Sequence, residues 1–306
     1  MHKPHFKWIE KLIHFEYLYQ PSAPDPVDLA LSEEDVISQR GGGSGTSLFL
    51  GHYTREEVVK ALERTGVISA AGKRGFKDVS VAIDTADPYH HRLLMHAGRE
   101  GTELLLGEIK VSEGTFTPKT AFIPGTGMTN LEMIIIEWIC LQDPSAKFAA
   151  DKPKLPGQAH PGLGVGKKVS RLLVDMASAL GKDGILNFPE YYHNAVFYSL
   201  IFLFFNPYMQ GRLLAMERDL RQFPVHRVSD AILKGCLVDG RTSAYVQWSP
   251  EEQICPVSKR TRAYFESKQY KSIVSGALEE NSFTIDWSKY ETVLSAEHAK
   301  EPGIAP

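Results

Sequence analysis

Apolar residues along this chain repeat with two different periods, and the two periods divide it into predicted strands and helices. Residues 79–84 alternate between apolar and polar positions, and 91–97 and 103–113 do the same on either side of a glycine-containing turn. This alternation predicts strands, the last two as an antiparallel pair. Residues 131–142, LEMIIIEWICLQ, are apolar and β-branched over most of their length. They predict a central strand that is buried on both faces.

Other segments have helical spacing. Thr54-x-x-Glu57 is a capping box, in which each end satisfies a free amide of the other, and it predicts a helix start. Residues 167–180 place apolar side chains at i, i+3, i+4 and i+7, which predicts a helix with one apolar face, closed by Gly181. Residues 1–20 have near-helical spacing of aromatic and aliphatic side chains, which is typical of an amphipathic helix.

The second half of the chain predicts a further mixture of elements. Residues 143–161 are rich in Pro, Lys and Ala and indicate a loop insertion. A short strand is expected at 185–188, a helix at 192–204 and another strand within 211–220. The pattern Ser249-Pro250-x-Glu252 predicts a tail helix with Ser as its cap and Pro in its first turn. Strands and helices therefore alternate in a mixed α/β (α+β) fold.

Composition narrows the classes of function. The chain has 306 residues, 43% of them apolar, and a formal net charge of -3. Such a charge offers no basic field for a nucleic-acid partner. The three cysteines, Cys140, Cys236 and Cys255, are far apart and odd in number, which argues against a disulfide scaffold or a zinc knuckle. The longest apolar run, 195–205, is too short to span a membrane, and the charged start is not a signal peptide. A cytoplasmic location is expected.

A glycine-rich loop carries the main chemical signal. Residues 161–168, PGLGVGKK, connect the predicted central strand to the predicted helix. Glycines allow a ligand close to the backbone, and the start of a helix presents free N–H groups, so the loop suits a phosphate. The P-loop pattern fails because Lys168 replaces Ser or Thr and Pro161 replaces the first Gly. The dinucleotide fingerprint fails because its third glycine falls on Lys167.

A third template fits in part. Gly164 and Gly166 match the pyrophosphate loop [QR]-x-x-G-x-[GA] of the GNAT N-acyltransferases, with Pro161 in the place of Gln or Arg. The strands before the loop, and 194–198 (NAVFY) after a short strand, follow the family's order of elements. Over roughly 76–220, the chain therefore resembles a divergent GNAT acyltransferase.

The resemblance implies a GNAT-like, mixed and largely antiparallel sheet flanked by helices. An N-terminal extension would occupy 1–75, an acyl-CoA-binding core 76–220, and a C-terminal extension packed on the core 221–306. Acyl-CoA would be the co-substrate, held in a gap between two splayed strands and by the loop. The acceptor would be a small-molecule or peptide amine, with no metal, and a homodimer is compatible with the sequence. The implied binding residues are Gly162, Leu163, Gly164, Val165, Gly166, Lys167 and Asn194.

Two residues are candidates for the acid–base steps. Glu137 interrupts the apolar run of the central strand, where burial would raise its pKa as suits a general base, and the family often has a base on this strand. The alternative is a salt-bridged or edge-facing Glu137, and Glu132 is the second choice for the base. Tyr198 matches the family's tyrosine that protonates the leaving thiolate, or it is a core tyrosine. The neighbouring side chains that could replace it are Tyr191, Tyr192 and His193.

Other functions remain open from the sequence. Asp84, Asp87, His90, His91 and His96 are close together, but they lack a fixed ligand spacing, so no metal site is predicted. A non-catalytic ligand-binding or interaction protein on the same scaffold is one alternative to the acyltransferase. A phosphate-ligand enzyme of another type is a second. The side chains Glu137 and Tyr198 facing one cleft would favour the acyltransferase.

Overall fold

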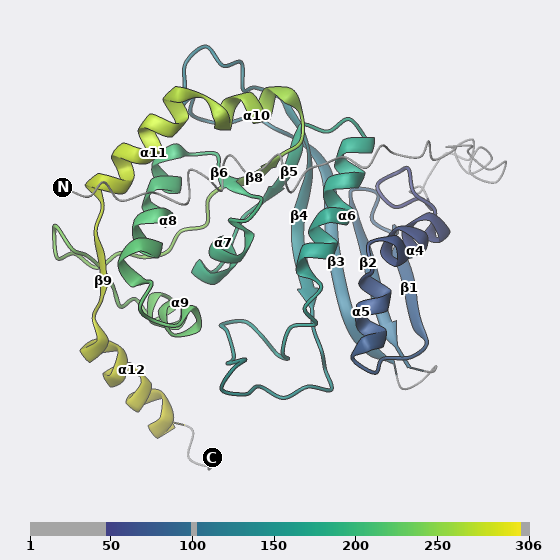
Figure 1. Ribbon diagram of the computed structural model, residues 1–306, viewed down its shortest axis with the longest axis horizontal. Coiled ribbons are helices and arrows are strands. Elements are labelled where there is room, and N and C mark those ends of the chain that lie inside the picture. The colour runs from purple at the N-terminus through teal and green to yellow at the C-terminus, as the bar shows by residue number, and fades with distance from the viewer. Residues whose placement is uncertain (1–46, 99–102, 301–306) are drawn as a thin grey trace.

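The computed structural model describes residues 47–98 and 103–300, which form one large sheet, a small second sheet and surrounding helices (Figure 1). The helix predicted at 1–20 and most of the turn between 97 and 103 lie outside the described residues. The large sheet has the order β1-β2-β3-β4-β5-β8-β6. All its pairs are antiparallel except β4 with β5. The predicted α+β class with a largely antiparallel sheet is confirmed.

The first four strands form a meander, β1 (Val79–Asp84), β2 (His90–Ala97), β3 (Leu104–Phe116) and β4 (Leu131–Leu141). They confirm the strand at 79–84, the antiparallel pair and the central strand. β2 shows why the pattern was informative, since its residues alternate between intermediate and full burial. The expected burial of both faces of β4 is wrong for its second half, where Glu137 and Trp138 are exposed.

Three helices cover one face of this meander (Figure 1). These are α4 (Arg55–Arg64), α5 (Val67–Lys73) and α6 (Gly166–Ala179). The capping box at the start of α4 is present as predicted. α6 buries Leu172, Leu173 and Met176 in a cluster shared with β1–β5, α4 and α5. The predicted helix at 167–180 and its apolar face are therefore confirmed.

The remaining elements extend the sheet and build a second core. They are β5 (Gly184–Asn187), α7 (Tyr192–Tyr198), β6 (Leu203–Phe204), α8 (Pro207–Leu220), α9 (Val225–Leu233), β7 (Leu237–Asp239), β8 (Gln253–Pro256), α10 (Lys259–Glu266), α11 (Lys268–Glu280), β9 (Phe283–Ile285) and α12 (Trp287–Lys300). α7, α8, α9 and α12 contribute to one hydrophobic cluster. α10 and α11 contribute to another, which also contains the apolar residues Met133, Leu186 and Ile254 of β4, β5 and β8.

Three predictions in this half are wrong. The helix expected over 192–204 ends at Tyr198, because Leu203 and Phe204 pair with β8 as β6. The segment 211–220 is helical, since Asn206 caps α8 and Pro207 begins it. No helix begins at Ser249, because 253–256 is a fully buried strand between β5 and β6. In the last case pairing on both sides outweighs a local capping signal.

Candidate functional site

The predicted glycine loop begins where the long loop returns to β4. Gly162 forms a bridge with Gln142, and the amide of Leu163 donates to the carbonyl of Leu141 at 3.1 Å. Residues 143–161 therefore leave the end of β4 and return to it. This confirms a loop insertion at that position. Leu163 and Val165 are buried and anchor the loop, while Gly162, Gly164 and Gly166 are exposed.

The loop presents a group of free backbone amides. Within the described residues, the N–H groups of Gly164, Val165, Gly166 and Lys167 have no hydrogen-bond acceptor. They lie at the start of α6, where the helix dipole places partial positive charge. Gly164 has a φ of 78°, which a residue with a Cβ adopts only with strain. This arrangement can bind an anion such as a phosphate.

A cation that the sequence pattern did not reveal lies over the loop. A Cβ on Gly164 would be 3.0 Å from Nη2 of Arg74, at the end of α5. Nη1 of Arg74 is 3.1 Å from Oδ2 of the buried Asp143. This ion pair holds the guanidinium beside the loop. Of the two predicted lysines, Lys168 reaches the carbonyl of Thr65 at 3.3 Å, and Lys167 is exposed.

Next to the loop, β4 and β5 separate. Their parallel pairing comprises Met133–Gly184, Ile134–Ile185 and Ile135–Leu186. Beyond Ile135, no described strand pairs with β4 on that side before the bridge at Gln142. Between the end of this parallel pairing and the glycine loop, the edge of β4 on the β5 side therefore has no strand partner among the described residues.

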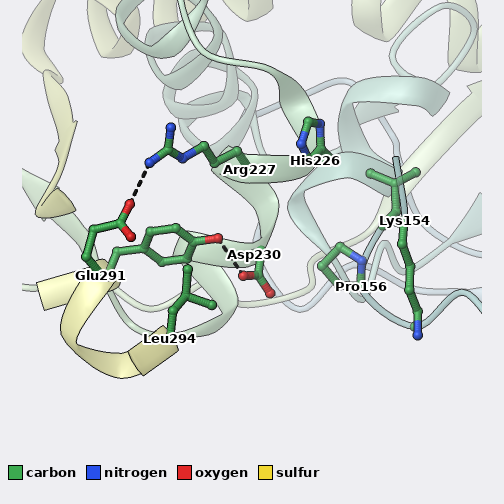
Figure 2. A pocket seen from close by; sticks show the side chains of 10 residues that line it. Lys154, Pro156, His226, Arg227, Asp230, Glu291 and Leu294 are labelled. Atoms are coloured by element: carbon green, nitrogen blue, oxygen red, sulfur yellow. Dashed lines mark hydrogen bonds and ion pairs between the residues drawn. The ribbon is translucent and has the colours of Figure 1, made fainter. Parts of the chain in front are cut away.

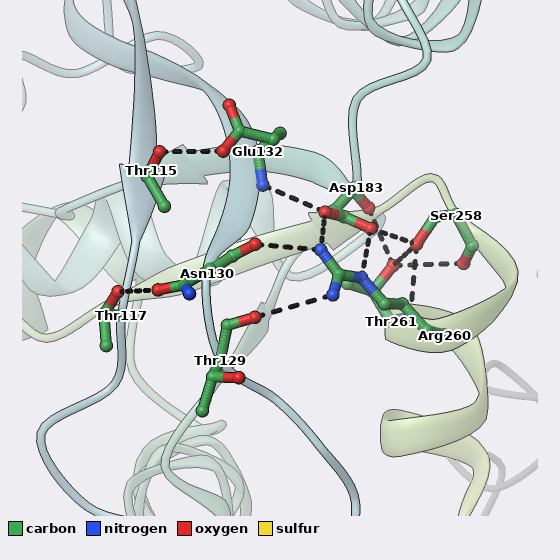
Figure 3. Close-up of polar contacts among 9 residues, drawn as sticks. All are labelled: Thr115, Thr117, Thr129, Asn130, Glu132, Asp183, Ser258, Arg260 and Thr261. Atoms are coloured by element: carbon green, nitrogen blue, oxygen red, sulfur yellow. Dashed lines mark hydrogen bonds and ion pairs between the residues drawn. The ribbon is translucent and has the colours of Figure 1, made fainter.

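Asp183 fixes the opposite end of β4 and β5 (Figure 3). Its carboxylate accepts hydrogen bonds from the Glu132 amide at 2.9 Å and from Ser258 Oγ at 2.8 Å, and it pairs with Arg260. The Arg260 guanidinium holds the pKa of Asp183 below its usual value, against the effect of burial. The two strands are thus joined firmly at one end and separate at the other.

Glu137 occupies a β-bulge at this separation. Lys110 pairs with Trp138 and Val111 pairs with Ile136, so Glu137 is the extra residue of β4. Its carboxylate contacts His90 Nδ1, and Lys110 Nζ is 3.0 Å from its Oε2. A bulge can redirect a side chain and leave backbone groups unpaired, which is common beside active sites.

The electrostatics of Glu137 differ from expectation. Burial raises its pKa, but hydrogen bonds from Lys110, Ser112 and His90 outweigh burial, and the net pKa is lowered. The expected raised pKa is therefore wrong. Glu132, the second choice, is exposed and accepts a hydrogen bond from Thr115 Oγ1 at 2.7 Å (Figure 3).

Tyr198 ends α7 and packs against the cluster on the α6 side of the sheet. Burial raises the pKa of its hydroxyl. Lys110 and Ser112 alternate with Ile109 and Val111, which face that same cluster. Glu137, bound to Lys110 and Ser112, therefore lies on the other side of the sheet. The two candidates are thus on opposite sides of the sheet and lack the arrangement that would favour the acyltransferase, in which both face one cleft.

The remaining candidates near α7 contact other residues of the protein through hydrogen bonds and ring packing. Asn194 is half-buried, and its backbone N–H donates a hydrogen bond to the Tyr191 carbonyl at 3.0 Å. His193 Nδ1 is 2.8 Å from Ser229 Oγ, and burial lowers the pKa of His193 to about 4. Tyr192 packs edge-on against Trp248, and burial raises its pKa. Tyr191 stacks on His193 with ring centroids 5.4 Å apart.

The Asp and His residues near β2 are dispersed among different contacts. His91 is buried, and its Nδ1 accepts the Leu50 amide at 2.7 Å. His90 contacts Glu137, and Asp87 accepts the amide of Tyr89 within its own turn. Among the described residues, no group of three or more His, Cys, Asp or Glu side chains could hold a metal ion.

A separate pocket of about 630 Å³ lies between the 143–161 loop, α9 and α12 (Figure 2). On one side Arg227 pairs with Glu291 at 2.6 Å, and the Tyr290 hydroxyl donates to Asp230 at 2.8 Å. Lys154 lies on the opposite side in Figure 2. This pocket contains none of the residues predicted from the glycine loop or from the acid–base candidates. Its mixed charges suit a polar ligand.

Comparison with known proteins adds no assignment, since no protein-family model and no curated protein matches the sequence. Within the described ranges, no helix combines the length and apolar character needed to cross a bilayer. Function must therefore be argued from the site itself.

Proposed function

We propose that this protein is an N-acyltransferase that transfers an acyl group from acyl-CoA, or from an acyl carrier thioester, to an amine. The observation that carries the proposal is the separation of β4 and β5 directly beside a loop with four free amides. A long thioester donor has both groups that such a site would bind. Its pyrophosphate needs N–H donors, and its pantetheine arm can pair with a free strand edge. The GNAT resemblance points to the same arrangement.

The loop and Arg74 account for binding of the donor's charged end. The amides of residues 164–167 would bind the pyrophosphate, and Arg74 would replace the Gln or Arg that the family has where Pro161 stands. Asp143 holds Arg74 at 3.1 Å, so its position does not depend on the ligand. A preorganised cation and several amides favour an anion more than either alone.

The two acid–base candidates lie on opposite sides of the sheet, so in this proposal each would serve a different part of the reaction. The acceptor nitrogen attacks the thioester carbon from the Glu137 side, the C–S bond breaks, and the nitrogen proton passes to Glu137 or to its partner His90. Tyr198 donates its proton to the leaving thiolate from the α6 side and recovers one from solvent. Backbone N–H groups at the β4 bulge would stabilise the oxyanion. The lowered pKa of Glu137 favours the variant in which the carboxylate orients His90 and the imidazole takes the proton.

The alternative is a non-catalytic ligand-binding or interaction protein on the same scaffold. The observation that favours it is the engagement of Glu137 by both Lys110 and His90, which stabilises a charged carboxylate at the expense of its basicity. The acceptor, a small-molecule or peptide amine, and a homodimer are further parts of the acyltransferase proposal. An acyl-CoA donor also agrees with the expected cytoplasmic location.

A binding screen followed by a turnover assay tests the proposal. The purified full chain is heated with coenzyme A, acetyl-CoA or ATP, and its melting temperature is recorded. We expect stabilisation by both CoA compounds and none by ATP. Thiol release from acetyl-CoA is then followed with a panel of amines. CoA binding without turnover on any amine would favour the binding protein, and stabilisation by ATP alone would favour another phosphate-ligand enzyme. No effect of any compound would refute the acyltransferase and favour the interaction protein.

A further inference from the structure

Within the described residues, two buried amide side chains on the paired strands β5 and β8 have polar atoms without hydrogen-bond partners. Asn187 is 3% exposed, and neither its Nδ2 nor its Oδ1 has a partner. Gln253, which is 0% exposed, lies opposite Asn187 in the β5–β8 register, and its Oε1 also has none. Gln253 Nε2 reaches only the Ala195 carbonyl, at 3.5 Å. Buried polar groups without partners are rare and costly, so this group calls for a ligand or a water.

Both amides lie on the side of the sheet that faces α6. Ile185 and Cys255 belong to the cluster beneath α6, and Asn187 and Gln253 are two positions along the same strands. The next residues, Leu186 and Ile254, face the opposite cluster. Tyr198 also packs on the α6 side. The amides and the proposed thiolate acid therefore share one side of the sheet.

The position along β5 is at the separation of the strands. The last β4–β5 pair is Ile135–Leu186, so Asn187 is the first residue of β5 beyond it. From this level to the end of β4 at Leu141 is about 17 Å, at roughly 3.3 Å per residue. An extended pantetheine arm anchored at the glycine loop would span that length. Its thioester would then lie beside Asn187, with the acyl group directed toward Gln253.

The surroundings of the two amides are otherwise apolar. Phe204 pairs with Gln253 and is 0% exposed, and Ala195 and Ile254 are also 0% exposed. An unsubstituted alkyl chain beside the two amides would match these apolar neighbours, but it would leave the amide groups without partners. A neutral donor or acceptor on the chain would satisfy them. Specificity of this kind is strong because the wrong ligand leaves buried polar groups unpaired.

We propose that Asn187 and Gln253 select acyl donors that have a neutral hydrogen-bonding group, such as a hydroxyl, close to the thioester carbon. This inference rests on the proposed acyltransferase function. The amide of the pantetheine arm has the same hydrogen-bonding chemistry, but it would lie nearer the glycine loop. Substitution of Asn187 or Gln253 distinguishes the two partners. If the amides bind the acyl chain, only hydroxyacyl donors are affected, and if they bind the pantetheine arm, all CoA compounds are affected.

The test compares donors that differ by one hydroxyl. kcat/KM is measured for propanoyl-CoA and 2-hydroxypropanoyl-CoA, and for butanoyl-CoA and 3-hydroxybutanoyl-CoA. We expect at least one of the two hydroxyacyl donors to be preferred at least about tenfold by the natural protein. Asn187→Leu and Gln253→Leu should each reduce that preference toward unity while the Kd for free coenzyme A is unchanged. Gln222→Leu, at an exposed position, is the matched control.

Each other outcome overturns the proposal in a distinct way. Equal use of all four donors would show that the amides hold a trapped water. A uniform loss of affinity for all CoA compounds in Asn187→Leu would assign the amides to the pantetheine arm. Binding of coenzyme A with no turnover of any donor would mean that the acyltransferase function fails. If the variants do not fold, the donor preference of the natural protein alone decides.

Discussion

The guanidinium of Arg74 lies over Gly164, with Nη2 3.0 Å from the position that a Cβ there would take. The two residues come from distant parts of the sequence and meet because α5 and the start of α6 cover the same face of the sheet. A side chain on Gly164 would collide with the guanidinium, and a ligand anion bound by the loop would contact it. Predictions about the loop therefore concern both residues.

Substitution of the loop glycines should impair binding of coenzyme A. Gly164→Val adds a side chain where φ is 78° and Arg74 is close, so we expect loss of binding together with a destabilisation of about 1–2 kcal/mol. Gly166→Val separates the two effects, because its φ is ordinary and a Cβ there meets no atom within 4 Å. We expect it to weaken binding with little change in melting temperature. Calorimetric titration with coenzyme A measures the affinity and a thermal scan measures the melting temperature. Unchanged affinity in Gly166→Val would argue against the loop.

Arg74 should contribute a charge-assisted contact to the ligand. We expect Arg74→Met to lower the affinity for coenzyme A by roughly 10- to 100-fold, the scale of a hydrogen bond to a charged group. The affinity of the variant should also depend less on salt. Lys73→Met, at an exposed neighbour on the same helix, is the control for net charge. Equal affinities of the two variants would show that Arg74 serves only its ion pair with Asp143.

Substitution, together with the pH dependence of turnover, distinguishes the two proton acceptors near β4. The pKa of Glu137 is lowered, so its carboxylate stays ionised well below neutral pH. If Glu137 is the base, activity is present above this lowered pKa and is lost only as pH falls below about 4.3. If His90 takes the proton, we expect His90→Gln to lower kcat by about 100-fold, whereas a Glu137 base would tolerate that substitution. In either case we expect Glu137→Gln to lower kcat by about 100-fold. Undiminished kcat in both Glu137→Gln and His90→Gln would exclude both groups.

The effect of Tyr198 on kcat should depend on how strongly the leaving thiolate needs a proton. Burial raises the pKa of its hydroxyl, so the phenol keeps its proton at neutral pH and can donate it. We expect Tyr198→Phe to lower kcat by about 10- to 100-fold with an alkyl thioester. An aryl thioester, whose thiolate needs no proton, should be almost unaffected. Tyr208→Phe, at an exposed position, is the control. An equal loss with both thioesters would indicate a packing role only.

The sequence predicted those parts of the fold that depend on local patterns. The alternation in β2 and the apolar face of α6 follow from a few neighbouring residues. β8 was missed because four residues become a strand only through pairing with β5 and β6. The same distinction between local and tertiary features applies to the candidate site. The glycine loop is contiguous and was located, whereas Arg74, and the Asn187–Gln253 pair, come together only through tertiary contacts.

Asp183 provides a last prediction, which links stability to the geometry of the strands (Figure 3). Its side chain is 10% exposed and joins the start of β5 to β4 and to α10. Asp183→Asn keeps the shape but loses the ion pair with Arg260. We expect a loss of roughly 2–3 kcal/mol in the free energy of unfolding, less than for a fully buried pair because Arg260 is 43% exposed.

The pH dependence of this loss has a definite sign. Because the folded-state pKa of Asp183 is lowered, its contribution is present above the unfolded value of about 3.9 and disappears as pH falls through the folded value. Urea unfolding should therefore separate Asp183→Asn from the natural protein fully at pH 7 and progressively less below about pH 4. Asp151→Asn, at an exposed loop position, should show no difference at either pH. A difference that persists undiminished at pH 2 would mean that the cost arises from packing, so that Asp183 does not join the strands by its charge.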